Sequence, residues 1–180
     1  MSRFEFIFVL ISIVAGLALT QLLSGLPRSL RPAEGKTDIA HVLFSLATIV
    51  LLMSVWWNSF RWDQHETWTF VEYSLIFVYI SIFYVMAAIL HPAHSSAVPQ
   101  FDEIRTQFYV VFFLYNFVEI LVVYVRDGYL SPWGYLPLPI HLSVLAGVGF
   151  FLRNRRFDQF FGAWHLLTAI AFEFSARLAA

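Results

Sequence analysis

Six stretches of about twenty mostly apolar residues follow one another along this chain, joined by short connections. A helix needs roughly 20 apolar residues to cross the hydrocarbon core of a bilayer. Backbone amide and carbonyl groups in lipid must bond within their own segment, so each stretch is expected to be helical. The sequence therefore predicts an all-α, polytopic transmembrane helix bundle with about six spans. The expected spans are residues 4–26, 38–60, 68–90, 101–125, 133–152 and 157–178.

The composition is typical of a chain embedded in lipid. Of the 180 residues, 59% are hydrophobic and only 13% are charged, whereas soluble domains carry about 25% charged residues. The longest expected connection, 27–37, leaves no room for a soluble domain, so we expect one transmembrane domain over 1–180 that contacts the lipid bilayer. The net charge of −1 and the lack of a long basic run make a nucleic-acid partner unexpected. The absence of cysteine excludes disulfides and thiolate metal sites.

The first and fifth stretches are the least regular of the six. Residues 4–26 are as apolar as a signal peptide, but Glu5 stands where a basic residue is expected, so we interpret the stretch as a retained helix. The fifth stretch contains Pro132, Pro137 and Pro139, and proline removes a backbone donor and clashes with the preceding helical turn. This span therefore either begins near Pro139 and is short, or begins near Pro132 and is kinked.

Lysine and arginine residues near the span ends predict the orientation, because cytoplasmic loops are enriched in them. With six spans, the first, third and fifth connections share one side of the membrane. That side holds Arg28, Arg31, Lys36, Arg105, Arg153, Arg155 and Arg156. The side with both termini holds Arg3, Arg61, Arg126 and Arg177. We therefore expect both termini outside the cell membrane.

The segment WWNSFRWDQHETW connects the second and third spans and holds four of the six tryptophans: Trp56, Trp57, Trp62 and Trp68. Trp133 is expected on the same side of the membrane. Indole rings favour the headgroup region, because the ring is apolar and its N–H is wet. Two interpretations remain open, an interface belt that holds this hairpin at a fixed depth and the mouth of a binding site.

The first half of the chain also carries a resemblance. GLALTQLLSGLPRSLR in the first hairpin, followed by WWNSFRW and WTF, resembles a functionally uncharacterised family of small bacterial multi-pass membrane proteins. The similarity covers about the first ninety residues and rests on the spacing of aromatic and small residues. It implies a bacterial inner-membrane location and carries over no active-site residue.

Glu119 is the strongest candidate for a functional residue, because it lies just past the middle of the fourth expected span. An ionisable side chain within a bilayer costs about 2.5 kcal/mol or more, so it needs a partner or a role. Asn116, Tyr115 and Arg126 lie three, four and seven residues away, which places them on the same helix face. We expect this face to point into the bundle, with Glu119 as a neutral acid, a paired anion or a proton-carrying site.

Charged residues from five spans are expected at a similar depth, where they would form one polar layer. Its members would be Glu5, Arg61, Glu72, Glu119, Arg126, Glu173 and Arg177, the last two spaced as a favourable i,i+4 pair. The layer could be a salt-bridge network, a hydrated cavity that opens outward, or separate side chains that reach the interface. The expected binding residues for an ion or ligand are Glu119, Asn116, Tyr115, Glu72, Glu173, Arg177, Arg61 and Arg126.

The histidines suggest an alternative site on the opposite half. A b-type haem needs two axial histidines at matching depth on facing helices, and His41 with His165 or His91 could supply them. The pair His91 and His94 is a weak match to a metal site, because a proline lies between them. Most single membrane histidines are packing residues, so we expect no cofactor or metal ligand, with haem b as the exception to test.

No phosphate-binding loop or hydrolase motif is recognised, so an enzyme is not expected. The leading hypothesis is an ion or proton channel, or a small-ligand transporter, that uses the polar cluster. The alternatives are a structural or accessory membrane subunit without transport activity and, less favoured, a haem or quinone redox protein. Small residues one turn apart in the first span, Ser12, Gly16 and Thr20, could pack helices internally or join protomers in a homo-oligomer or a membrane complex.

Overall fold

The computed structural model describes residues 3–30, 37–65, 67–93, 98–130 and 135–178, apart from the side chains of 3, 64 and 175–178. The described residues form helices and no strand, so the expected all-α fold is confirmed. The elements are α1 (Arg3–Leu30), α2 (Ile39–Asn58), the short 3₁₀ helix η1 (Ser59–Gln64), α3 (Phe70–Leu90), α4 (Phe101–Asp127), α5 (Pro137–Leu152) and α6 (Arg155–Leu178).

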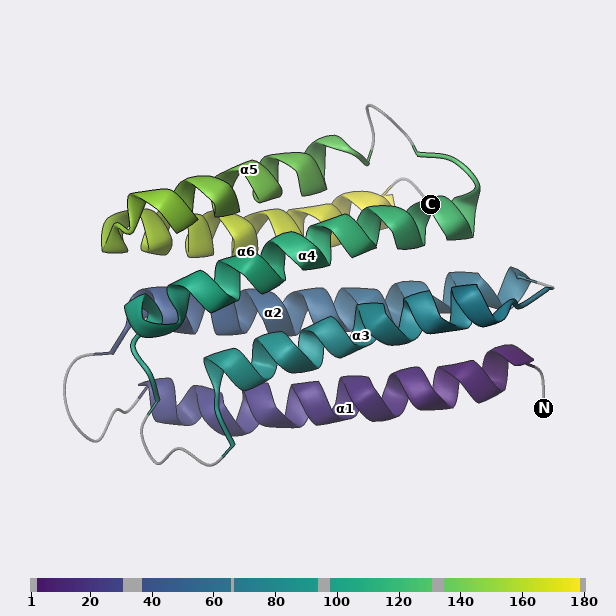
Figure 1. Ribbon diagram of the computed structural model, residues 1–180, viewed down its shortest axis with the longest axis horizontal. Coiled ribbons are helices and arrows are strands. Elements are labelled where there is room, and N and C mark those ends of the chain that lie inside the picture. The colour runs from purple at the N-terminus through teal and green to yellow at the C-terminus, as the bar shows by residue number, and fades with distance from the viewer. Residues whose placement is uncertain (1–2, 31–36, 66, 94–97, 131–134, 179–180) are drawn as a thin grey trace.

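The helices run antiparallel to their neighbours in sequence and close into a ring (Figure 1). Around the ring, α1 packs on α3, α3 on α4, and α4 on α5, while α5, α6, α2 and α1 complete the circuit. Figure 1 shows the ring flattened into two layers, with α1–α3 below α4–α6. The start of α1 and the end of α6 lie at the same end of the bundle, as an even number of antiparallel helices requires.

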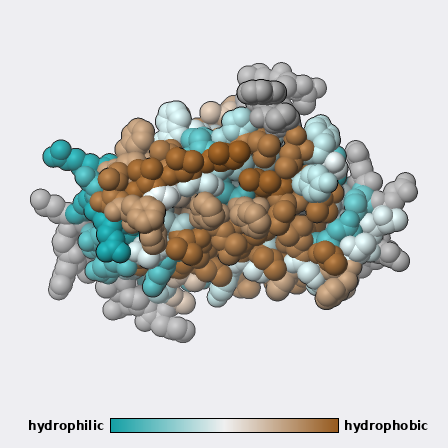
Figure 2. Space-filling model, turned by 45° about the horizontal axis from the view of Figure 1, so that its top comes forward, coloured by the Kyte–Doolittle hydropathy of each residue, from teal (hydrophilic) through white to brown (hydrophobic). Residues whose placement is uncertain are grey.

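Four helical segments are long and apolar enough to cross a membrane: Phe4–Leu30, Ile39–Asp63, Phe70–Leu90 and Phe101–Asp127. Helix α5 is apolar but has only 16 residues, and α6 carries charged residues near both of its ends. Figure 2 shows a broad apolar band across one face, with hydrophilic residues at its two ends. These features indicate an integral membrane protein, with four of the six expected spans supported by length and composition.

Side-chain capping fixes where several helices begin. The Asp38 carboxylate accepts hydrogen bonds from the backbone N–H of Ala40 at 3.1 Å and of Phe101 at 2.8 Å, so one buried residue starts α2 and anchors the start of α4. Thr69 and Glu72 form a reciprocal capping box at the start of α3. Such caps satisfy the backbone donors that the first helical turn leaves without partners.

Two helix boundaries settle or correct the expectations from sequence. Helix α5 begins at Pro137, so of the two alternatives the short helix is correct; Pro132 lies outside the described residues. Proline is tolerated in the first turn of a helix, because its missing N–H has no partner there. Helix α1 continues through Pro27 to Leu30, four residues beyond the expected end, and Pro27 interrupts only the last turn.

An aromatic cluster fills the half of the bundle where α2 and α4 begin. Its members are Phe44, Phe101, Phe108, Tyr109, Phe112 and Phe161, all of them fully buried. The ring centroids of Phe44 and Phe101 lie 4.6 Å apart, and those of Tyr109 and Phe161 lie 5.8 Å apart. Gly149 makes room for this packing, because a Cβ atom at that position would lie 2.7 Å from the Tyr109 ring.

Candidate ligand-binding cavity

A cavity of about 310 Å³ lies inside the ring, in the half opposite the aromatic cluster. Its volume is at the lower end of the range for small-molecule sites. Every helix contributes to its wall, for example Ile11 from α1, Ser54 from α2, Trp62 from η1, Tyr79 from α3, Glu119 from α4, Leu138 from α5 and His165 from α6. The cavity is therefore formed by the whole bundle and not by one pair of helices.

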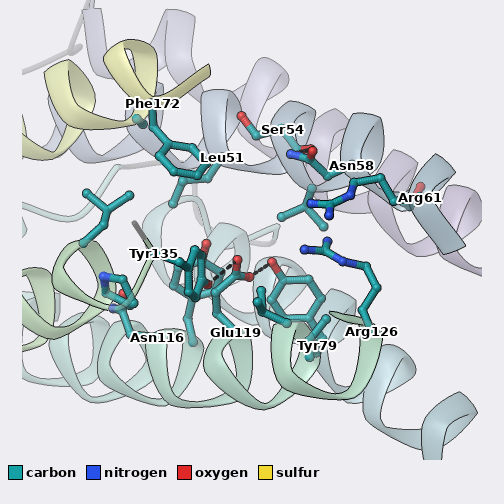
Figure 3. Close-up of a pocket in the computed structure, with 18 of the residues that line it drawn as sticks. Leu51, Ser54, Asn58, Arg61, Tyr79, Asn116, Glu119, Arg126, Tyr135 and Phe172 are labelled. Carbon is teal, nitrogen blue, oxygen red and sulfur yellow. Dashed lines mark hydrogen bonds between the residues drawn. The ribbon is translucent and has the colours of Figure 1, made fainter. Parts of the chain in front are cut away.

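Glu119 lies on the wall of this cavity between two tyrosines (Figure 3). The Tyr79 hydroxyl donates a hydrogen bond to one carboxylate oxygen, and the Tyr135 hydroxyl donates to the other at 2.8 Å. Burial and the nearby Glu119 carboxylate raise the pKa of Tyr135, which keeps its hydroxyl protonated as a donor. The two hydroxyls hold the carboxylate in a fixed position while leaving it further capacity to accept hydrogen bonds.

Two arginines and one aspartate stand at the end of the cavity. Asp127 accepts hydrogen bonds from Arg126 at 2.8 and 3.0 Å and from Arg61 at 3.3 Å. The Arg61 side chain is 58% exposed, and Figure 3 shows Arg61 and Arg126 reaching toward the same end of the cavity. The ion pair from η1 to the end of α4 therefore marks the exposed rim of the cavity.

Six of the eight side chains expected to bind an ion or ligand line this one cavity: Tyr115, Asn116, Glu119, Arg126, Arg61 and Glu173. Asn58, on α2, donates a hydrogen bond to Glu173 across the cavity wall at 3.4 Å. Asn116 is almost fully buried and donates to the Phe112 carbonyl within its own helix. The Arg177 side chain lies outside the described residues, so its expected pairing with Glu173 stays a prediction.

Glu72 does not belong to the cavity, which corrects the expected set of binding residues. Its carboxylate accepts from the Thr69 backbone N–H at 2.7 Å and contacts the His65 ring at 3.1 Å. A glutamate three residues after a helix-capping threonine satisfies the end of its own helix, and this local role holds Glu72 away from the centre. Glu5 is exposed on α1 and does not line the cavity either, so the expected polar layer is smaller than predicted.

Arg105 lies on the same helix as Glu119 but belongs to a different cluster. Its Nε and Nη2 atoms bond Asp158 at 2.9 and 2.6 Å, and the Tyr109 hydroxyl donates to the other carboxylate oxygen at 2.7 Å. The Arg105 and Asp158 side chains are 9% and 1% exposed. Arg105 was counted among the basic residues of a connection, and the structure instead buries it between α4 and α6.

The rings of His41 and His91 touch edge to face, with centroids 5.0 Å apart, which leaves no room for a haem iron between them. His165 lies in the cavity wall, and its pairing with His41 around a haem stays a prediction. Burial lowers the pKa of His91 to about 3, and its Nε2 atom bonds Ser45 at 3.0 Å. Within the described part of the chain, no group of three or more His, Asp and Glu side chains is suited to a metal ion.

The tryptophan-rich segment divides into an outer and an inner part. Trp56 and Trp57 are exposed on the apolar surface, as an interface belt predicts. Trp62 is buried and lines the cavity, and its ring centroid lies 5.3 Å from that of Trp68. The exposed pair is consistent with an interface belt, and the buried Trp62 is consistent with a binding mouth, so both interpretations stay predictions; Trp133 lies outside the described residues.

Sequence reasoning missed the side chains that hold the charged groups in place. Tyr79 lies in an uninterrupted apolar stretch, Tyr135 lies in a connection, and Asp127 and Asp158 lie at helix ends. A buried carboxylate needs hydrogen-bond donors, and this requirement was the available signal that Glu119 has tyrosine partners. Which tyrosines they are depends on the packing of α3 and α5 against α4.

Comparison with known proteins yields no relative. No family model, no curated protein and no solved structure matches this chain. The resemblance to the bacterial membrane-protein family therefore stays a prediction from the sequence.

Proposed function

We propose that this protein binds a small organic cation in the central cavity and transports it across the membrane. The observation that carries the proposal is the Glu119 carboxylate, which two tyrosine hydroxyls hold in a cavity lined by all six helices. We place the protein in a bacterial inner membrane with both termini outside. In that orientation the Arg61 rim faces outward.

The balance of charge in the cavity favours a cationic ligand. Three carboxylates and two guanidinium groups line it: Glu119, Asp127, Glu173, Arg61 and Arg126. Asp127 already binds both arginines, whereas Glu119 is held by neutral hydroxyls. When Glu119 is ionised, it is a buried carboxylate held by neutral hydroxyls, which favours a ligand that brings a positive charge.

The shape and aromatic content of the wall favour an organic cation over a metal ion. The rings of Tyr79 and Tyr115 stack 6.0 Å apart, and both line the cavity with Tyr135. Aromatic faces attract alkylammonium and guanidinium ions and are worth about 2 kcal/mol when desolvated. A small metal ion instead needs several oxygen ligands around one point, and Glu119 is the central carboxylate of this wall.

A transporter suits the bundle better than an open channel. The aromatic cluster and the buried Arg105–Asp158 pair fill the half of the bundle beyond the cavity. A cation bound at Glu119 would therefore need a rearrangement of α4 and α6 to leave at that end. Alternation between two such states is the mechanism of many secondary transporters.

Binding to the purified protein in lipid nanodiscs tests the site. We expect saturable binding of tetramethylammonium or guanidinium, and at least about tenfold weaker binding, or about 1.4 kcal/mol, in Glu119→Gln. Tyr135→Phe should weaken binding less, because the carboxylate remains. Glu103→Gln is the matched control, since Glu103 is an exposed carboxylate on the same helix. Equal binding by the wild type and Glu119→Gln, or saturable binding of sodium alone, would overturn the proposal.

Flux into proteoliposomes tests the transport step. We expect uptake of radiolabelled tetramethylammonium or guanidinium, whichever binds, that saturates with concentration and is lost in Glu119→Gln. Saturable binding without uptake would favour a receptor or an accessory subunit over a transporter. The structural-subunit alternative predicts neither binding nor uptake.

A further inference from the structure

A second hollow, a groove of about 520 Å³, lies on the outer side of α1 and α2. Ser12 and Gly16 of α1 form one wall, and Met53 and Trp57 of α2 form another. The last two side chains are 61% and 55% exposed, and both helices are apolar enough to span a membrane. If α1 and α2 span the membrane, the groove faces the acyl chains of the bilayer.

The groove adjoins the central cavity at the seam between α2 and α6. Ser54 and Glu173 line both hollows. Asn58, one turn beyond Ser54, donates to the Glu173 carboxylate and also to the Ser54 carbonyl. A carboxylate thus stands where the apolar groove meets the central cavity.

We propose that this groove is a bilayer-side entrance to the cavity and that it holds the alkyl chain of an amphiphilic cation. The inference rests on the proposed function, and it assigns the ligand to cations that carry a hydrocarbon tail. The chain would lie along Leu19, Met53 and Trp57, while the charged head would meet Glu173 and then Glu119. Burial of each CH₂ group favours such binding by about 0.8 kcal/mol relative to water.

Charge complementarity favours this occupant over an anionic phospholipid or a second copy of the chain. Glu173 lies among mostly apolar side chains, and the head of an anionic phospholipid placed near it would be repelled. A second protomer would have to bury that carboxylate against its own apolar surface, which is costly without a partner. A cationic head is attracted to the Glu173 carboxylate and also gives it a partner when it is buried.

A substitution at Gly16 blocks the groove without disturbing the fold. Nothing lies within 4 Å of the position that a Cβ atom would occupy at Gly16, so Gly16→Leu fills the groove with side-chain atoms. Gly147 on α5 has the same free space and lies outside both hollows, so Gly147→Leu is the matched control. Ser12→Leu is a second blocking variant, because Ser12 lines the groove and not the central cavity.

The test compares tetramethylammonium with dodecyltrimethylammonium, which share a head but differ in the tail. Binding is measured in nanodiscs and corrected for partition into empty discs. We expect the wild type and Gly147→Leu to bind dodecyltrimethylammonium at least tenfold more tightly than tetramethylammonium. Gly16→Leu and Ser12→Leu should bind the tailed cation no more tightly than tetramethylammonium, and should bind tetramethylammonium as the wild type does.

The outcomes separate this inference from the proposed function. If the tailed cation still binds more tightly than tetramethylammonium in both Gly16→Leu and Ser12→Leu, the groove assignment is overturned, while tetramethylammonium binding still supports the central site. If tetramethylammonium does not bind but the tailed cation binds in a Gly16-sensitive way, the groove stands and the central headgroup site falls. A change of oligomeric state in Gly16→Leu, measured by mass photometry, would assign the groove to self-association and overturn the proposal.

Discussion

Asp158→Ala is expected to be among the most destabilising single substitutions in the bundle. The carboxylate receives three hydrogen bonds, two from Arg105 and one from Tyr109, and its side chain is 1% exposed. Removal of one partner from a buried ion pair costs about 3–5 kcal/mol, because the remaining charge is left unpaired. The Arg105 side chain is only 9% exposed, so water cannot replace the lost carboxylate without opening the seam between α4 and α6.

A graded series of variants checks this magnitude. Tyr109→Phe removes one hydrogen bond to a charged acceptor and should cost about 1.5–3 kcal/mol. Asp102→Ala is the control, because Asp102 is an exposed carboxylate at the start of the same helix that carries Arg105; it should cost at most about 1 kcal/mol. The measurement is equilibrium unfolding in mixed micelles of rising dodecyl sulfate content, followed by tryptophan fluorescence and helicity.

The result that would refute the reasoning is equally specific. If Asp158→Ala lowers the free energy of unfolding no more than Asp102→Ala does, Asp158 is not needed to compensate the buried charge of Arg105. Replacement of both partners, Arg105→Met with Asp158→Leu, should restore most of the lost stability, because a well-packed apolar pair avoids the desolvation of both charges. A double variant as unstable as Asp158→Ala would mean that packing, and not the unpaired charge, sets the cost.

Gly25→Ala should cost about 2 kcal/mol or more in the same assay, because the new Cβ would lie 2.1 Å from Cγ of His91; Gly16→Ala, which meets nothing within 4 Å, should be neutral or mildly stabilising. Thr69→Ala removes the capping box of α3 and should cost about 0.5–2 kcal/mol, so an unchanged unfolding midpoint would contradict the cap. Acid should destabilise the fold, because burial lowers the pKa of His91 to about 3, below the value near 6.5 of an unfolded histidine. The unfolded chain then binds more protons as the pH falls from 6.5 toward 3, and His91→Gln should flatten this part of the stability–pH curve.

The helical fold follows from sequence because lipid restricts the choices. The apolar stretches had to be helices, since the bilayer offers the backbone no other partner. The spans near 38–60, 68–90 and 101–125 lie within a few residues of α2, α3 and α4. Boundaries were less accurate where proline intervenes, because Pro27 could either end a helix or stand in its last turn.

The central residue of the candidate site also followed from sequence, for an energetic reason. A glutamate near the middle of an apolar span must be shielded from lipid, and helical spacing placed Asn116 and Tyr115 beside Glu119 on one face. Glu72 was assigned to the same layer because its depth matched. Depth does not distinguish a side chain that caps its own helix from one that points inward.

The partners of the charged residues could not be derived from one sequence. Tyr79 and Tyr135 reach Glu119 from α3 and from the connection before α5, and Asp158 reaches Arg105 from α6. Such contacts depend on which helices are neighbours and on their rotation. Neither is encoded in spacing along a single helix, because α3, α5 and α6 could be arranged around α4 in several ways.

The two ion pairs that flank the cavity differ in what it costs to separate them. Arg61 is more than half exposed in its pair with Asp127, and exposed ion pairs contribute at most about 1 kcal/mol. Separation of the buried Arg105–Asp158 pair costs about 3–5 kcal/mol unless new partners replace the old. Under the proposed function, the ligand-free protein therefore rests with the Arg61 end accessible. Opening the other end would require binding energy from a ligand that interacts more strongly with that second state.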